Sequence, residues 1–161
     1  MPLGASRAGL MSVAADDIPD SVVSRPDDND TTNRSDSRGL RINPNASYEA
    51  VGVRISANTS GVSRARLYDY NASEYIETVD VSDLSSGDTF SFDSSIYEGV
   101  DYGIELDDNG DSWTMGFADG AQDYPYTGDD IDIVGNSIDG TKDVVNAQAV
   151  NDIGNPDGIL D

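Results

Sequence analysis

The segment Tyr102-Gly103-Ile104-Glu105-Leu106 is followed by Asp107-Asp108-Asn109-Gly110-Asp111 and then by Trp113-Thr114-Met115-Gly116-Phe117. In the two outer segments apolar residues alternate with polar or small ones, which is the period-two pattern of a strand with one buried face. The Asn109-Gly110 pair between them is typical of a hairpin turn. This stretch therefore predicts two strands joined by a tight turn.

The same alternation, interrupted by Gly, Asn, Asp and Ser, continues on both sides of this stretch. It predicts strands at 40–42, 51–55, 65–68, 75–81, 89–92, 102–106 and 113–117. The turn signals recur about every 8–12 residues, and helical i, i+3, i+4 spacing is absent. The fold class that this predicts is all-β, an antiparallel β-sandwich or jelly-roll-like domain.

Three zones follow from composition. Residues 40–120 form the predicted sandwich domain. Residues 1–39 are rich in Asp, Ser, Asn and Arg, which predicts an extended acidic arm that becomes ordered only against another subunit. Residues 121–161 hold candidate strands at 130–135 and 144–153. We expect this last zone to complete the sandwich or to form an intersubunit contact.

The charge of the chain indicates the solvent in which it works. Its 161 residues include 9 Lys plus Arg against 31 Asp plus Glu, for a net charge of −22. Five of the acids are Glu and the rest are Asp, while Lys142 is the single lysine. Abundant Asp with almost no Lys is the halophilic pattern, and at about 1 M salt a Debye length of roughly 3 Å makes self-repulsion weak. A mesophilic acidic protein and a disordered chain are the alternatives.

Composition also excludes several functions. Without His or Cys, the chain has no disulfides, no thiolate zinc site and no Ser-His-Asp or Cys-His nucleophile. Nine cations in so acidic a chain do not form a nucleic-acid surface. No apolar run approaches 18 residues, so we expect no membrane insertion, and the N-terminus lacks the apolar region of a standard signal peptide. Carboxylates are plentiful, but no motif singles out a catalytic pair, so we expect no enzyme.

One segment is a candidate cation site. Asp107, Asn109 and Asp111 stand at alternate positions, as the first ligands of an EF-hand loop do, which makes Ca²⁺ or Mg²⁺ a candidate ligand. The pattern then departs from an EF-hand, because Ser112 replaces the glycine at position six and Ala118 replaces the glutamate at position twelve. A turn without a bound ion is the alternative, and no other cofactor is expected.

Two tyrosines are candidate glycan contacts. Tyr68 and Tyr70 lie two residues apart, so on a strand their rings share a face. Aromatic rings stack on sugar faces, and neighbouring carboxylates accept hydrogen bonds from sugar hydroxyls. The alternative is that Trp113 and several tyrosines belong to the core of the sandwich.

Several short segments, in order, carry a resemblance. They are Gly4-Ala5-Ser6-Arg7-Ala8-Gly9-Leu10, Ile18-Pro19-Asp20-Ser21, Gly39-Leu40-Arg41-Ile42, the hairpin-like stretch 58–69, Asp132-Ile133-Val134-Gly135 and Asn151-Asp152-Ile153-Gly154. This arrangement resembles the virion structural proteins of tailed viruses that infect haloarchaea, in particular tail, fibre or capsid-decorating β-sandwich subunits. The family supplies no catalytic residues.

The resemblance implies a location on the extracellular particle surface, in a high-salt environment. It also implies a homo-oligomer, often three- or fivefold, whose N-terminal arm anchors it to other virion proteins. We therefore expect a non-enzymatic tail, baseplate or fibre subunit with a role in host attachment through a surface glycan or S-layer. The alternatives are a capsid turret or decoration protein, a lectin-like carbohydrate-binding module, and a pilus-like cell-surface protein.

Overall fold

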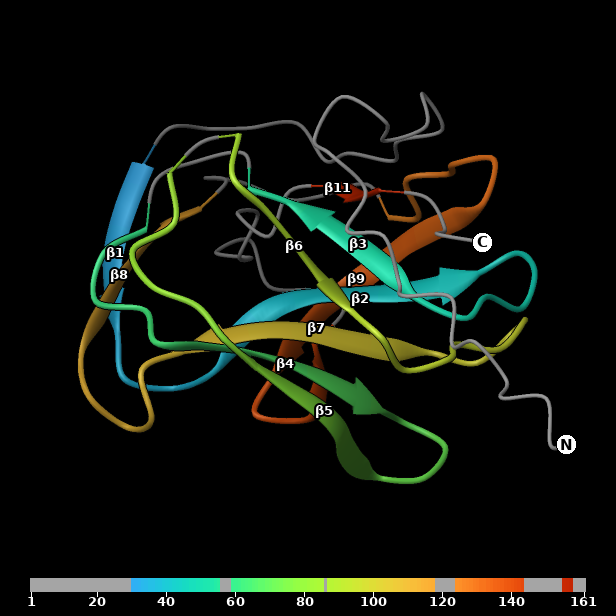
Figure 1. The fold of residues 1–161 in the computed structure, drawn as a ribbon, viewed down its shortest axis with the longest axis horizontal. Coiled ribbons are helices and arrows are strands. Elements are labelled where there is room, and N and C mark those ends of the chain that lie inside the picture. Colours follow the sequence, from blue (N-terminus) through green and yellow to red (C-terminus); the bar gives the residue numbers. More distant parts are fainter. Residues whose placement is uncertain (1–29, 56–58, 86, 118–123, 144–154, 158–161) are drawn as a thin grey trace, which may run out of the picture.

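The computed structural model describes residues 30–55, 59–85, 87–117, 124–143 and 155–157, and every regular element in them is a β-strand (Figure 1). The strands are β1 (Asp30–Arg34), β2 (Arg38–Pro44), β3 (Val51–Arg54), β4 (Arg64–Asp69), β5 (Glu74–Asp80), β6 (Thr89–Phe92), β7 (Tyr102–Asp107), β8 (Trp113–Phe117), β9 (Ile131–Ile138), β10 (Thr141–Asp143) and β11 (Asn155–Asp157). All of their pairings are antiparallel. The predicted all-β class is confirmed.

Two sheets form the body of the domain. The larger sheet has six strands in the order β10-β9-β2-β7-β4-β5, and the smaller has three in the order β11-β3-β6. A separate two-stranded sheet, β1-β8, lies at one end of the molecule (left in Figure 1). This arrangement is sandwich-like, as predicted.

The apolar core lies between the two larger sheets and follows from alternation along their strands. Leu40 and Ile42 of β2 and Val51 and Val53 of β3 all lie in it, and all four are at most 1 % exposed. Complete burial of one such side chain contributes about 1.5–3 kcal/mol before entropy is counted. The other core residues are Ile55, Val62, Ala65, Leu67, Leu84, Phe92, Ile96, Tyr102, Ile104, Leu106, Trp113, Ile131 and Ile133.

The folded unit begins earlier than the sequence predicts. The arm was expected to extend over residues 1–39, but β1 and the start of β2 lie inside this range. β1 pairs with β8 from Asp30–Phe117 to Arg34–Trp113, and β2 is central in the large sheet. Backbone groups can pair even where the side chains are polar, so low hydrophobicity did not prevent this segment from forming a strand. Residues 1–29 lie outside the described residues.

The C-terminal zone contributes to the sandwich. The predicted strand at 130–135 corresponds to β9, which lies beside β2, and β11 pairs with β3. The predicted strand at 144–153 lies outside the described residues. β9 and β11 place part of this zone in the two larger sheets, and an intersubunit contact stays a prediction.

The turn at Asn109-Gly110 forms, but it does not close a hairpin. Asn109 and Gly110 have φ values of 54° and 96°, and the N–H of Asp111 donates to the carbonyl of Asp108 at 3.0 Å. β7, before the turn, pairs with β2 and β4, whereas β8, after it, pairs with β1. The predicted hairpin is wrong because the turn carries the chain from the large sheet to the two-stranded one.

Candidate functional site

The most unusual chemistry of the domain lies on the face of the large sheet that is turned away from the apolar core. Because side chains alternate along β7, Ile104 and Leu106 enter the core and Glu105 and Asp107 point to the opposite face. Both carboxylates are nevertheless buried, at 0 % and 3 % exposure, and they are the buried acids of the described residues. Buried carboxylates require compensating partners.

The turn between β9 and β10 covers this face. Gly140 in that turn has a φ of 68°, and a Cβ atom there would lie 2.6 Å from a ring carbon of Tyr68. A Cβ on Gly103 would lie 2.2 Å from Ser137 Oγ. The two glycines therefore allow β9 and its turn to approach β4 and β7 closely, although β9 and β4 are not neighbours in the sheet.

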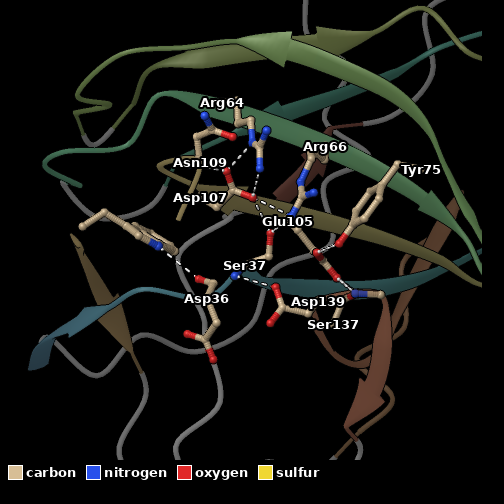
Figure 2. Close-up of polar contacts among 12 residues, drawn as sticks. Asp36, Ser37, Arg64, Arg66, Tyr75, Glu105, Asp107, Asn109, Ser137 and Asp139 are labelled. Atoms are coloured by element: carbon tan, nitrogen blue, oxygen red, sulfur yellow. Dashed lines mark hydrogen bonds and ion pairs between the residues drawn. The ribbon is translucent and has the colours of Figure 1, made fainter. Parts of the chain in front are cut away.

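Asp107 binds two arginines of β4 (Figure 2). Arg64 lies opposite it in the register and donates to both of its oxygens, with Nη2 3.2 Å from Oδ2. Arg66 Nη2 lies 2.5 Å from Oδ2, and Ser37 Oγ donates to the same oxygen at 2.7 Å. Burial would raise the pKa of Asp107, but the bonds from Arg64, the Asn109 N–H and Ser37, with the charge of Arg66, hold it below its usual value. This carboxylate is therefore ionised at neutral pH.

Glu105 is held by neutral donors instead. The Tyr75 hydroxyl donates to Oε2 at 2.7 Å, and the Gly140 N–H donates to Oε1 at 2.9 Å. Ser137 Oγ donates to Oε1 as well (Figure 2). Arg66 lies opposite Glu105 in the register, with its guanidinium carbon 3.9 Å from the centre of the Tyr75 ring. One buried carboxylate thus links β5, β7 and the β9–β10 turn.

Three tyrosines complete the network. The Tyr68 ring packs edge to face against Tyr70 and Tyr75, at 4.9 Å between centroids in both pairs. The Tyr70 hydroxyl shares a hydrogen bond with Ser137 Oγ at 2.5 Å. Burial raises the pKa of Tyr70 to about 12, and burial together with the bond to Glu105 raises the pKa of Tyr75. Both phenols are therefore neutral hydrogen-bonding groups at neutral pH.

A second ionic cluster surrounds Asp101, at the start of β7. Lys142 Nζ lies 2.7 Å from Asp101 Oδ2, Asn43 Nδ2 donates to Oδ1 at 2.8 Å, and Arg41 Nε lies 3.8 Å from Oδ2. Burial would raise the pKa of Asp101, but Lys142, Asn43 and Arg41 lower it. The cluster joins β10 to β2, and Lys142 also lies over the Tyr70 ring at 4.9 Å.

The structure places the residues of the candidate cation site in different surroundings. Both oxygens of Asp107 accept bonds from arginine, whereas Asn109 and Asp111 are exposed in the turn that follows. In the part of the chain that the structure describes, no three Asp or Glu side chains gather into a group that could hold a metal ion. Ca²⁺ or Mg²⁺ at these three positions stays a prediction, and the arginines on Asp107 weigh against it.

The candidate glycan residues lie in the network. Tyr68 and Tyr70 share a face, as expected, but both rings are half-buried and pack against other tyrosines and Gly140. Trp113 is 1 % exposed and donates from Nε1 to the Asp36 carbonyl at 3.1 Å, so it belongs to the core. Glycan binding by Tyr68 and Tyr70 stays a prediction that would require the β9–β10 turn to move.

Five residues of this network were not predicted as site residues: Ser37, Arg66, Tyr75, Glu105 and Ser137. Their role depends on which strands are neighbours, which alternation does not reveal. One signal was available, because Arg64 and Arg66 occupy alternate positions of one strand in a chain with only nine cations. Two scarce cations on one strand face indicate buried acidic partners.

Comparison of the chain with protein-family models, with curated proteins and with solved structures gives no match. The described part of the chain also contains no helix that is long and apolar enough to span a membrane.

The chemistry of the network is that of a second, polar core. Tyr75, Ser137 and Gly140 bind Glu105, and Arg64 and Arg66 bind Asp107. These bonds engage both oxygens of each carboxylate. What they do is hold the two ends of a curled sheet together.

High pH should open this polar core. The pKa of Tyr70 is raised in the folded state, to about 12. Its contribution to the free energy of unfolding is therefore complete below the pKa of the unfolded state, near 10, and is lost as pH rises toward 12. We expect cooperative alkaline unfolding in this window, measured by circular dichroism together with tyrosinate absorbance at constant salt. Tyr70→Phe should move the transition to higher pH. Tyrosines that all ionise while the fold remains intact would contradict this interpretation.

Gly140→Ala should destabilise the β9–β10 turn more than a simple backbone effect allows. The new methyl group would overlap the Tyr68 ring, and a φ of 68° is strained for alanine, so we expect a loss of about 2–3 kcal/mol. Gly110→Ala is the matched control, because its φ of 96° is also positive but nothing lies within 4 Å. We expect it to lose about 1–2 kcal/mol in urea unfolding. Equal losses of stability in the two variants would show that the contact with Tyr68 does not contribute to the effect.

Proposed function

We propose that the chain is a non-enzymatic structural subunit of a haloarchaeal virus particle, exposed on its surface in a tail, baseplate or fibre. The observation that carries this proposal is the sign of the exposed charges. In the described residues Lys142 is the exposed cation, while the arginines are buried or half-buried. The exposed acids are Glu49, Glu74, Asp80, Asp83, Asp88, Asp93, Glu98, Asp111, Asp129 and Asp139.

Such a distribution suits a protein that folds and works in brine. Carboxylates without neighbouring cations repel one another across several ångströms in dilute buffer, and this repulsion is screened at molar salt. Two of the scarce arginines, Arg64 and Arg66, contribute instead to the polar core, where the attraction between charges is less sensitive to salt. A halophilic subunit is therefore favoured over a mesophilic acidic one.

The proposal of a structural rather than a catalytic role rests on the polar core. The two buried carboxylates, Glu105 and Asp107, hold strands together through hydrogen bonds. The edge strands of a sandwich can pair with other subunits, and β5 is an edge strand of the large sheet. We propose a homo-oligomer, three- or fivefold, anchored to other virion proteins through its N-terminal residues.

Two measurements test this proposal. Light scattering of the full chain at about 2 M KCl, where charge is largely screened, should give the mass of a discrete oligomer. Mass spectrometry of gradient-purified particles, from a haloarchaeal culture that produces the chain, should detect its peptides in fixed ratio to other particle proteins. A monomer that is absent from such particles would overturn the proposal. Labelling of particles with an antibody would separate a tail from a capsid turret or decoration protein.

A carbohydrate-binding role is the second candidate. It is favoured by one observation outside the polar core. Tyr97, in the loop between β6 and β7, is exposed.

A further inference from the structure

Three loops meet at one end of the sandwich, on the side opposite to β1 and β8 (right in Figure 1). They are residues 45–50 after β2, residues 93–101 before β7 and residues 124–130 before β9. The Asn45 N–H donates to the Asp130 carbonyl at 2.8 Å, and the Gly99 N–H donates to the Pro44 carbonyl at 3.1 Å. Hydrogen bonds between loops thus tie this end into one surface.

Within this end, two segments pair as a minimal antiparallel ladder. Tyr48 and Ile96 exchange both backbone hydrogen bonds, at 2.8 and 2.9 Å. Ile96 is 0 % exposed and enters the core. By alternation, the residues on either side of this pair point outward. These neighbours, Ser47, Glu49, Ser95 and Tyr97, are all exposed, and we call them the Tyr97 patch.

Tyr97 is distinctive in its exposure. It is 57 % exposed, and in the described residues it is the one large hydrophobic side chain on the surface. Its backbone is nevertheless fixed, since its N–H donates to the hydroxyl of buried Tyr102 at 3.1 Å. The next N–H, of Glu98, donates to Ser47 Oγ at 3.1 Å. The ring is therefore presented by an ordered segment, so little ordering entropy opposes binding.

The register places polar groups beside this ring. Extending the ladder from the Tyr48–Ile96 pair sets Ser47 opposite Tyr97 and Glu49 opposite Ser95. Directly opposed side chains have Cβ atoms about 4.5–5.5 Å apart, and diagonal ones remain within reach of long side chains. One aromatic face, one carboxylate and two hydroxyls thus occupy an area similar to that of one or two sugar rings.

We propose that the Tyr97 patch binds a neutral glycan. A sugar ring would stack on Tyr97, and its hydroxyls would donate to Glu49 and exchange hydrogen bonds with Ser47 and Ser95. The acids of this end, including Glu98 and Asp129, disfavour nucleic acids and anionic polysaccharides. A single exposed ring also falls short of the roughly 800 Å² per partner that a stable protein interface buries.

As a contact with a host-surface glycan, this site rests on the proposed function, whereas sugar binding by the isolated chain does not. A shallow patch implies weak binding by one copy, and repetition in an oligomer raises the avidity without new contacts. Particle association and sugar binding can therefore succeed or fail separately.

The test is retention of the full-length chain on immobilised neutral polysaccharides (mannan, dextran and galactan) at about 2 M KCl, where charge is screened. We expect retention on at least one of the three, and none on heparin. Tyr97→Ala should weaken binding about tenfold, because the loss of one stacked ring is worth roughly 1.4 kcal/mol. Tyr97→Phe should keep most of the affinity, because it preserves the ring.

Glu49→Gln should also weaken binding, whereas Asp111→Asn, which removes an exposed carboxylate at the other end of β7, should not. Circular dichroism of each variant confirms that the fold is intact. No retention on any of the three polymers, or equal retention of the wild-type chain and Tyr97→Ala, would overturn the proposal. Loss of binding in Tyr68→Ala but not in Tyr97→Ala would move the site to the originally predicted tyrosines.

Discussion

Asp107→Ala should be the most damaging single substitution in the polar core, with an expected loss of about 3–5 kcal/mol in the free energy of unfolding. The substitution leaves Arg64 and Arg66 without the carboxylate that both contact, and their side chains are only 28 % and 16 % exposed. Because Arg64 can partly rehydrate, we expect a value near the lower end of this range. A domain of this size has about 5–15 kcal/mol in total, so much of its stability would be lost.

The measurement is urea unfolding at about 2 M KCl, a salt level that removes most surface repulsion. Asp111→Ala removes an exposed carboxylate four residues away and should stay within about 0.5 kcal/mol of the wild-type chain. Adding Arg64→Met to Asp107→Ala should recover part of the loss, because it removes one unpaired charge. If the double variant is no more stable than Asp107→Ala, the unpaired arginine is not the cause of the damage.

Low pH should weaken the ion pairs of Asp107 with Arg64 and Arg66. The pKa of Asp107 is lowered in the folded state, so its contribution is present above the unfolded value of about 3.9 and is lost as pH falls through the folded value. Asp101 has a lowered pKa as well and acts in the same direction. The acid transition of Asp107→Ala should therefore be shallower than that of the wild-type chain.

The features that could be predicted from the sequence depend on the local alternation of apolar and polar residues. The positions of Ile104, Leu106, Val51 and Val53 follow from period two alone, and all of them are core residues. Trp113 entered the core, as one of the two interpretations of the aromatic residues expected. The turn at 109–110 was recognised from its residues, because positive φ values favour Asn and Gly.

What it could not predict depends on pairing between distant strands. β2 lies between β7 and β9, so Gly39 is a neighbour of both Glu105 and Ser137, and nothing in its local sequence specifies this. The prediction of a hairpin at 109–110 was wrong for the same reason, because β8 pairs with β1. With 31 acids in the chain, Glu105 and Asp107 could not be distinguished from surface carboxylates until their strand neighbours were known.

Removal of salt should unfold the protein. Between about 1 M and 0.1 M salt the Debye length grows from roughly 3 to 10 Å, and the exposed carboxylates then repel one another across the surface. In the described residues Lys142 is the exposed cation, so few positive charges offset the repulsion between the carboxylates. We expect the loss to reach the order of the total stability, about 5 kcal/mol or more, with a folded chain at 2 M KCl and an unfolded one in dilute buffer.

The matched variant replaces Asp80, Asp83, Asp88 and Asp93 with Asn, which removes four negative charges from exposed positions. It should stay folded at lower KCl than the wild-type chain, as measured by urea midpoints across a salt series. Asp107→Ala should lower the midpoint by a similar amount at every salt concentration at which the wild-type chain is folded, because buried pairs are screened much less than exposed ones.

The shape of the salt curve identifies the cause. Screening is nearly complete once the Debye length is about 3 Å, so stability that depends on it should level off near 1 M KCl. Stabilisation through exclusion of salt from apolar surface would continue to rise at higher concentrations and would be stronger with sulfate. A curve that levels off, and that moves to lower salt in the Asn variant, assigns the salt requirement to the carboxylates. Full stability of the wild-type chain in dilute buffer would refute the halophilic interpretation.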